Sequence, residues 1–267
     1  MTIAVSTQLY GGAKLDQLWP LLEQADDAQL GVEIFPEPQL TRYPPMLQRA
    51  IPRLRGRSIT FHGPYWGIDP CFLPPEPEVA VYEKYWRETL ADAKALNANY
   101  VVYHLYNHHF AAEEREEKRQ AALQTLALTR QWAAEYGITL AIENTETSRN
   151  AGENLLTQQE YIELVRAQSD CGALIDIGHA SCAGWDLHEV MVALQDCIMG
   201  YHLHNNDGFS DSHRTILDGV IDMERFADDV SRYTPHAILT LEYVPEFAAE
   251  NDRICADLRW LKEHGLG

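Results

Sequence analysis

The feature that most constrains the fold is a regular alternation along the whole chain of short β-branched runs with longer helical patterns. Each run has the length and composition of a buried strand, and turn residues or a helical period follow it. This alternation predicts parallel strands joined by helical crossovers. The expected strands are Ile3–Leu9, Val32–Phe35, Ser58–His62, Tyr100–Leu105, Thr139–Glu143, Ala173–Ile177, Met199–His204 and Ile238–Glu242.

Helical patterns fill most of the segments between these strands. They cover Leu15–Gln29, Glu78–Leu96, Glu113–Tyr136, Gln158–Ala167, Leu187–Gln195, Met223–Arg232 and Glu246–His264. Eight strands, each followed by a helix or helical turn, predict an α/β fold, a (β/α)8 TIM barrel forming a single domain over residues 1–267. An open doubly wound sheet is the alternative. It would normally carry a glycine-rich first turn, and Gly11-Gly12 is a poor match.

Charge and composition narrow the classes of partner. The chain has 21 Lys and Arg against 40 Asp and Glu, a formal charge of −19, which opposes binding to a polyanion such as DNA. No apolar run reaches the length of a membrane span, and the first residues do not resemble a signal peptide. The five cysteines are scattered without a CxxC pair. We therefore expect a cytoplasmic protein with reduced thiols that acts on a small molecule.

Ionisable residues stand where the expected strands end. They are His62, His104, Glu143, Asp176, His204 and Glu242, with His179 shortly after the sixth strand. In a parallel barrel all these ends meet at one mouth. Taken singly, such a histidine or glutamate is usually a hydrogen-bonded or solvated residue. Charges that converge there are costly unless they are paired or bind a cation, so the set predicts a divalent-metal site.

The order of the motifs HGPY, IEN, DIGH, HLHNND followed by DSH, and LEY resembles the xylose-isomerase-like barrel superfamily. That superfamily includes isomerases of sugars and sugar phosphates, keto-sugar 3-epimerases, hydroxypyruvate isomerases and the endonuclease IV class. The resemblance implies one divalent ion, Mn, Co, Mg or Zn, held by four residues. By motif these are Glu143, Asp176, His204 and Glu242.

The resemblance also implies the chemistry. Glu143 and Glu242 would act as acid and base in a sugar or sugar-phosphate isomerase or epimerase that works through a metal-stabilised enediolate. The expected partner is a small carbohydrate, and barrels of this group often form homodimers. The alternative is an endonuclease IV-like phosphoesterase with up to three Zn ions. Its five extra ligands would be His62, His104, His179, Asp211 and His213.

Several assignments stay open from the sequence. Arg214 is equally a contact for a substrate hydroxyl or phosphate and a surface residue, and Glu33 either orients the sugar or closes the barrel floor. A barrel that binds a metal and a ligand without turnover is a third possibility. The fourth-strand motif is HLYNHH where relatives often have His followed by Pro-Gly, which brings His108 and His109 to the mouth.

Overall fold

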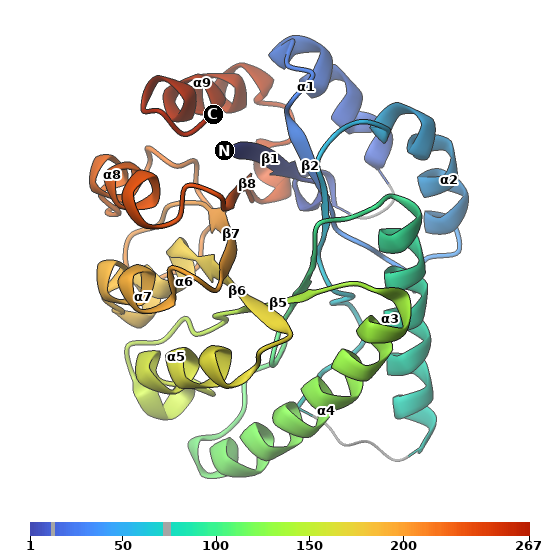
Figure 1. Cartoon of the computed structure of the whole chain (residues 1–267), viewed down its shortest axis with the longest axis vertical. Helices are drawn as coiled ribbons and strands as arrows, with labels where there is room; N and C mark the ends of the chain where they lie inside the picture. Colours follow the sequence, from blue (N-terminus) through green and yellow to red (C-terminus); the bar gives the residue numbers. More distant parts are fainter. Residues whose placement is uncertain (12–13, 72–75) are drawn as a thin grey trace.

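Parallel strands close into a barrel in which each strand pairs with its sequence neighbours and β1 pairs with β8 (Figure 1). The computed structural model describes residues 1–11, 14–71 and 76–267. The strands are β1 Thr2–Ser6, β2 Gly31–Ile34, β3 Ile59–Phe61, β4 Val101–Tyr103, β5 Leu140–Glu143, β6 Cys171–Asp176, β7 Ile198–Leu203 and β8 Ile238–Leu241. The predicted TIM barrel is confirmed.

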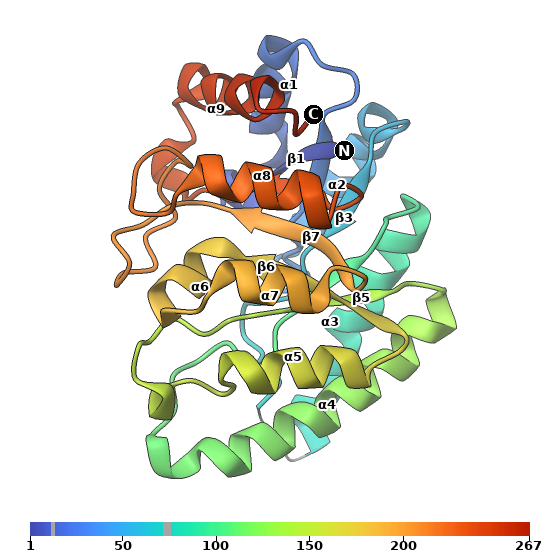
Figure 2. The same ribbon diagram turned by 60° about the vertical axis from the view of Figure 1, so that its left-hand side comes forward.

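Helices surround the barrel, and α5, α7 and α8 lie side by side on one flank (Figure 2). The helices are α1 Leu18–Ala25, α2 Tyr43–Leu54, α3 Glu76–Ala95, α4 Arg115–Tyr136, α5 Gln158–Ala167, α6 Ile177–Ala183, α7 Leu187–Leu194, α8 Met223–Tyr233 and α9 Asn251–Glu263. Among the described residues, no helix is long and apolar enough to cross a membrane.

Side chains on each strand alternate between the barrel interior and the surrounding helices. Outward residues such as Phe61, Ile142 and Ile175 belong to the main apolar core against the helices. Inward residues form a separate, smaller apolar cluster. It consists of Ala4, Tyr100, Val102, Ala141, Leu174 and Ile238, and we call it the lower layer. The ionisable strand-end residues lie one or two inward positions further along the same strands.

Helix α2 is missing from the sequence prediction. The prolines in the segment YPPMLQRAIPRL argue against a helix, yet Pro44 and Pro45 occupy the first turn of α2. A proline there loses no helical hydrogen bond, since the first backbone N–H groups have no partner within the helix. Pro52 lies inside the helix but within its last turn. Burial of Met46 and Leu47 against the barrel therefore outweighs the local signal.

Several predicted boundaries were wrong because 3₁₀ turns and a cap intervene. Residues Thr7–Tyr10 turn away from β1 as a 3₁₀ helix, and Pro245–Phe247 form a second one before α9. The sixth strand stops at Asp176, whose carboxylate accepts a hydrogen bond from the backbone N–H of His179. This cap begins α6 at the mouth of the barrel.

Candidate active site

The predicted strand-end residues do meet at the carboxyl ends of the strands. Their ligand atoms fall into three groups, and within each group these atoms lie within 4.8 Å of one another. The groups are His62, His104 and Glu143; Glu143, Asp176, His202 and Glu242; and His179, His204, Asp211 and His213. We call them the first, central and outer groups. The metal-binding and catalytic roles of these residues remain predictions.

The first group joins β3, β4 and β5. Nε2 of His104 lies 2.9 Å from Oε2 of Glu143 and 3.1 Å from Nε2 of His62. The other ring nitrogen of His62 lies 2.7 Å from the carbonyl oxygen of Gly63, which fixes the ring. Burial, followed by the neighbouring His104, lowers the pKa of His62. This lowered pKa favours the neutral imidazole, the form that binds a cation.

The central group is arranged around His202. Its Nδ1 lies 3.3 Å from Oε1 of Glu143 and 3.2 Å from Oε2 of Glu242. Its Nε2 lies 3.1 Å from Glu33, which is fully buried below it. Strand register explains this position, since His202 pairs with Asp176 on β6. Glu33 thus closes the floor beneath the imidazole, and the alternation in YHLH was the signal for a deeper histidine.

The negative charge of the central group is balanced by the imidazole of His202. Burial raises the pKa of Glu143, but His104 and His202 lower it more, so it ends well below its usual value. Burial likewise opposes ionisation of Glu242, and His202 contributes most to bringing its pKa to about 2. Burial lowers the pKa of His202, yet the surrounding carboxylates hold it well above the usual value. The imidazolium thus supplies positive charge that a metal ion could supply instead.

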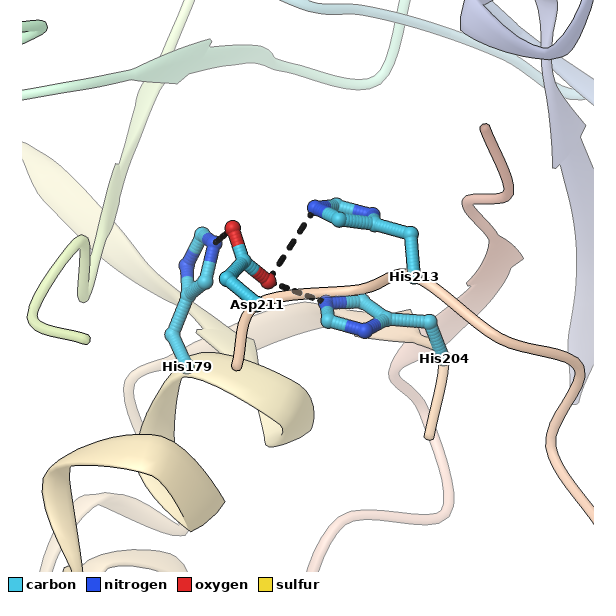
Figure 3. A group of neighbouring side chains, drawn as sticks. All are labelled: His179, His204, Asp211 and His213. Atoms are coloured by element: carbon cyan, nitrogen blue, oxygen red, sulfur yellow. Dashed lines mark ion pairs between the residues drawn. The ribbon is translucent and has the colours of Figure 1, made fainter. Parts of the chain in front are cut away.

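The outer group lies at the mouth, where Asp211 approaches three imidazoles (Figure 3). Its carboxylate oxygens lie 3.3 Å from Nε2 of His179 and 3.3 Å from Nε2 of His213. The rings of His204 and His213 stack with centroids 3.7 Å apart. His213 adopts a positive φ of 41°, which is uncommon outside glycine and turns its side chain toward the cluster.

His204 connects the outer and central groups. Its Nε2 lies 3.0 Å from the Asp176 carboxylate and 3.8 Å from Asp211. The ring is packed so closely on α6 that an ideal Cβ at Gly178 would come within 1.9 Å of its Cε1. The predicted ligand His204 therefore reaches Asp176, while His202 lies nearer to Glu143 and Glu242. Which imidazole completes the metal shell stays a prediction.

The donor set fits a divalent cation. Among the described residues, Oε1 of Glu242 and Nδ1 of His204 are buried without a hydrogen-bond partner. Leaving buried polar atoms unpaired costs free energy, which coordination of Glu242 to a cation would remove. Carboxylate oxygens combined with imidazole nitrogens suit Mn, Co or Zn, and carboxylates also suit Mg.

A cavity of about 440 Å³ opens above these groups. Its walls include His62, Glu143 and Glu242 together with the aromatic rings of Phe35, Tyr65 and Trp66, and the Phe35 ring stacks on His62 with centroids 4.5 Å apart. His104, His179, Asp211 and His213 also line it. The volume is typical of a small-molecule site, and aromatic rings beside polar groups suit a sugar with one apolar face.

Arg214 does not belong to this lining among the described residues. Its backbone pairs with Asn205 in both directions at 2.9 Å, which anchors the loop after β7. Its guanidinium contributes to the lowered pKa of Asp207, behind the backbone N–H groups of Ser210 and Phe209. These contacts favour the structural interpretation that the sequence left open.

The closed parallel barrel is a TIM barrel, and the buried carboxylates and imidazoles at its mouth could hold a metal ion. Residues 22–264 match the family described as xylose isomerase-like TIM barrel, and the chain belongs to this family. An uncharacterized protein of Methanocaldococcus jannaschii is 25% identical over 191 residues, which are 69% of this chain and 64% of that relative. The chain thus spans less than two thirds of that relative's length.

Solved structures share the fold over the full length. A D-tagatose 3-epimerase-like protein superposes with a TM-score of 0.76 at 21% identity, covering 98% of this chain and 99% of that one. A D-psicose 3-epimerase determined with D-fructose gives 0.76 at 11% identity with complete coverage of both chains. A protein from Thermus thermophilus that was soaked with ZnCl2 gives 0.71 at 22% identity, covering 100% of this chain and 99% of that one.

Proposed function

We propose that the protein is a divalent-metal-dependent epimerase or isomerase of a ketose or related polyhydroxy carbonyl compound. The observation that carries this proposal is the pair of Glu143 and Glu242. Both are buried, both line the cavity, and both approach the same nitrogen of His202 from different strands, at 3.3 and 3.2 Å. Two carboxylates that flank one point of a cavity floor suit proton removal and return at opposite faces of one carbon.

The metal would be held by Glu143, Asp176, Glu242 and an imidazole, for which we propose His204. When bound, it would supply Lewis-acid polarisation of the substrate carbonyl. One glutamate takes the proton from the carbon beside the carbonyl, and the other, protonated in the preceding turnover, returns a proton to the opposite face. His202, held by Glu33 below, fixes the two carboxylates. His179 contacts substrate oxygens from α6.

Solvent exchange tests this proposal directly. The protein would be incubated with ketohexoses and ketopentoses in D₂O, with Mn, Co, Mg or Zn, and followed by proton NMR. We expect deuterium to replace the hydrogen beside the carbonyl, with the epimer or aldose appearing. The labelled carbon distinguishes an epimerase from an isomerase. No deuterium incorporation into any ketose with any of these metals would refute the proposal.

Phosphoester hydrolysis at abasic sites is the second candidate, and the first and outer groups favour it. These two groups contain the five residues that the resemblance implies as additional ligands, and their donor atoms lie within 4.8 Å of one another in each group. The charge of −19 opposes it, because binding to DNA depends on contacts from Lys and Arg. Cleavage of an abasic duplex at low salt with Zn would favour this candidate, and an intact duplex would dismiss it.

A further inference from the structure

A second, smaller hollow adjoins the catalytic cavity beneath the loops that follow β4 and β5. Its volume is about 170 Å³, room for about five or six water molecules. It shares Tyr65, His104, His179 and Asp211 with the larger cavity. Because four residues border both spaces, the hollow lies next to the position of a ligand over the catalytic glutamates.

Hydrogen bonds fix the wall of the hollow before any ligand arrives. The side-chain amide of Asn107 donates to the carbonyl oxygens of Tyr65 and Ile68 at 3.3 and 3.0 Å. Its oxygen lies 3.2 Å from Nδ1 of His104. The hydroxyl of Tyr106 donates to the carbonyl oxygen of Thr145 at 3.0 Å, which ties the two loops together. The hollow is therefore preorganised, which lowers the entropic cost of binding.

Polar groups remain available in this wall. Thr145 is 8% exposed, and its buried hydroxyl has no hydrogen-bond partner among the described residues. Thr147 is half-buried and His109 is exposed, and both line the hollow without lining the larger cavity. Hydroxyls and an imidazole both donate and accept, so they match the hydroxyls of a sugar or polyol.

The side chains of the wall favour an uncharged occupant over a phosphate. Asp211 is the one carboxylate of the lining among the described residues, and it lies 3.3 Å from Nε2 of His179. His108 is paired with Asp69 at 3.0 Å. Among the described residues, the lining contains neither Lys nor Arg. A phosphate would thus face the Asp211 carboxylate and imidazole rings, without the guanidinium or ammonium groups that normally bind it.

We propose that this hollow is a subsite for an uncharged polyhydroxy group attached to the reacting sugar. The preferred substrate class is then a glycosylated ketose, not a ketose phosphate. This inference rests on the proposed function, because it places the reacting sugar over Glu143 and Glu242.

Three ligands that differ only in the substituent on the C6 oxygen of fructose test the subsite. They are D-fructose, D-fructose 6-phosphate and 6-O-α-D-glucopyranosyl-D-fructose, and dissociation constants would be measured by ligand-observed NMR on the metal-loaded protein. We expect the glucosylated ketose to bind at least about tenfold more tightly than D-fructose, and the phosphate more weakly than D-fructose. Equal affinities, or tightest binding of the phosphate, would overturn the proposal.

Variants separate the subsite from the reaction. Thr147→Val should remove at least about half of the logarithmic gain in affinity for the glucosylated ketose and leave D-fructose binding unchanged. Thr139→Val, next to the opposite end of β5, is the matched control and should change neither affinity. A gain that persists in Thr147→Val would contradict the assignment. Because binding is measured separately from deuterium exchange, inactivity toward every ketose would refute the proposed function, while the affinities of the three ligands decide the subsite.

Discussion

The lower layer and the mouth of the barrel are built on the same strands but have opposite chemistry. Ala141 and Leu174 belong to the apolar lower layer, while Glu143 and Asp176, two residues later on β5 and β6, are buried carboxylates. One inward position further along these strands, the side chains in the barrel interior therefore change from apolar to charged. Burying apolar surface stabilises the fold, whereas burying carboxylates costs free energy even when they are paired.

Because its buried carboxylates cost free energy, the mouth is not arranged for stability. Its carboxylates depend on proton-bearing imidazoles, and Glu242 still keeps an oxygen unpaired among the described residues. Arrangements of this kind are typical of sites whose residues serve binding or catalysis. Substitutions in the two layers should accordingly have different effects. Those at the mouth should reduce activity, and those in the lower layer should reduce stability.

The largest effect on activity should come from Glu143→Gln and Glu242→Gln. Each amide keeps the shape of the side chain but removes the base, so turnover should fall by about 10²–10⁴-fold. Circular dichroism should show that both variants remain folded. Glu263→Gln, exposed at the end of α9, is the control and should keep wild-type turnover. Wild-type rates in either mouth variant would refute the acid–base assignment.

Leu174→Ala should reduce stability and leave turnover almost unchanged. The side chain is fully buried in the lower layer, so its truncation should lower the free energy of unfolding by about 2–5 kcal/mol. Urea denaturation measures this change, and turnover per folded molecule should stay close to wild type. Leu128→Ala, on an exposed part of α4, should cost about 0.5 kcal/mol or less. A comparable cost at both positions would remove the distinction between the layers and the surface.

Gly178→Ala tests the packing of His204. The added Cβ would overlap the imidazole, so the ring must move away from Asp176. We expect metal affinity, measured by competition with a chelator, to weaken by about 10–100-fold. Gly152→Ala, where a Cβ meets only ordinary contacts, should leave the affinity unchanged. Unaltered metal binding in Gly178→Ala would show that His204 is not a ligand.

The stability of the metal-free protein should depend on pH. Burial opposes protonation of His213, but Asp211 raises its pKa to about 9 from the ordinary value of 6.5. A raised pKa stabilises the fold fully below pH 6.5, and this contribution is lost as the pH rises through 9. Thermal unfolding of chelator-treated protein should therefore occur at a lower temperature at pH 9 than at pH 6.5.

Glu242 should make the stability of the metal-free protein fall at acidic pH. Its pKa falls from 4.5 to about 2, so its stabilising contribution is present above pH 4.5 and is lost toward pH 2. Bound metal should leave the alkaline part of the profile in place, because His213 is not among the expected ligands and keeps its proton. Loss of the alkaline part in the metal-loaded protein would instead indicate coordination by His213.

Arg214→Ala should have the smallest effect. Its charge lies toward Asp207 and its backbone holds the loop, so kcat/KM for the best ketose should change by less than about twofold. A loss of tenfold or more would assign the guanidinium to the substrate after all.

Much of the fold could be predicted because strand and helix periods differ so clearly along this chain. Helix α2 could not, since proline content hides a segment whose helix is maintained by burial of Leu47. The cap by Asp176 also escaped prediction, because a strand end and a helix start overlap at one residue.

The site was predictable as a set of residue types, and its geometry was not. Alternation places His202 and His204 on the same face with His202 one layer deeper, and the pairing of His202 with Asp176 agrees with this prediction. The fit of Glu33 below His202 depends on contacts between distant strands. The small hollow depends on loop conformation, which motif order does not encode. Homodimer formation and a cytoplasmic location stay predictions.

Anomalous diffraction from crystals of protein purified without chelator, with metal content per chain determined in parallel, would locate each bound ion. We expect one divalent ion among Glu143, Asp176, Glu242 and an imidazole, that of His204. Three ions, with His62, His104 and His213 engaged as ligands, would contradict this expectation and favour phosphoester hydrolysis.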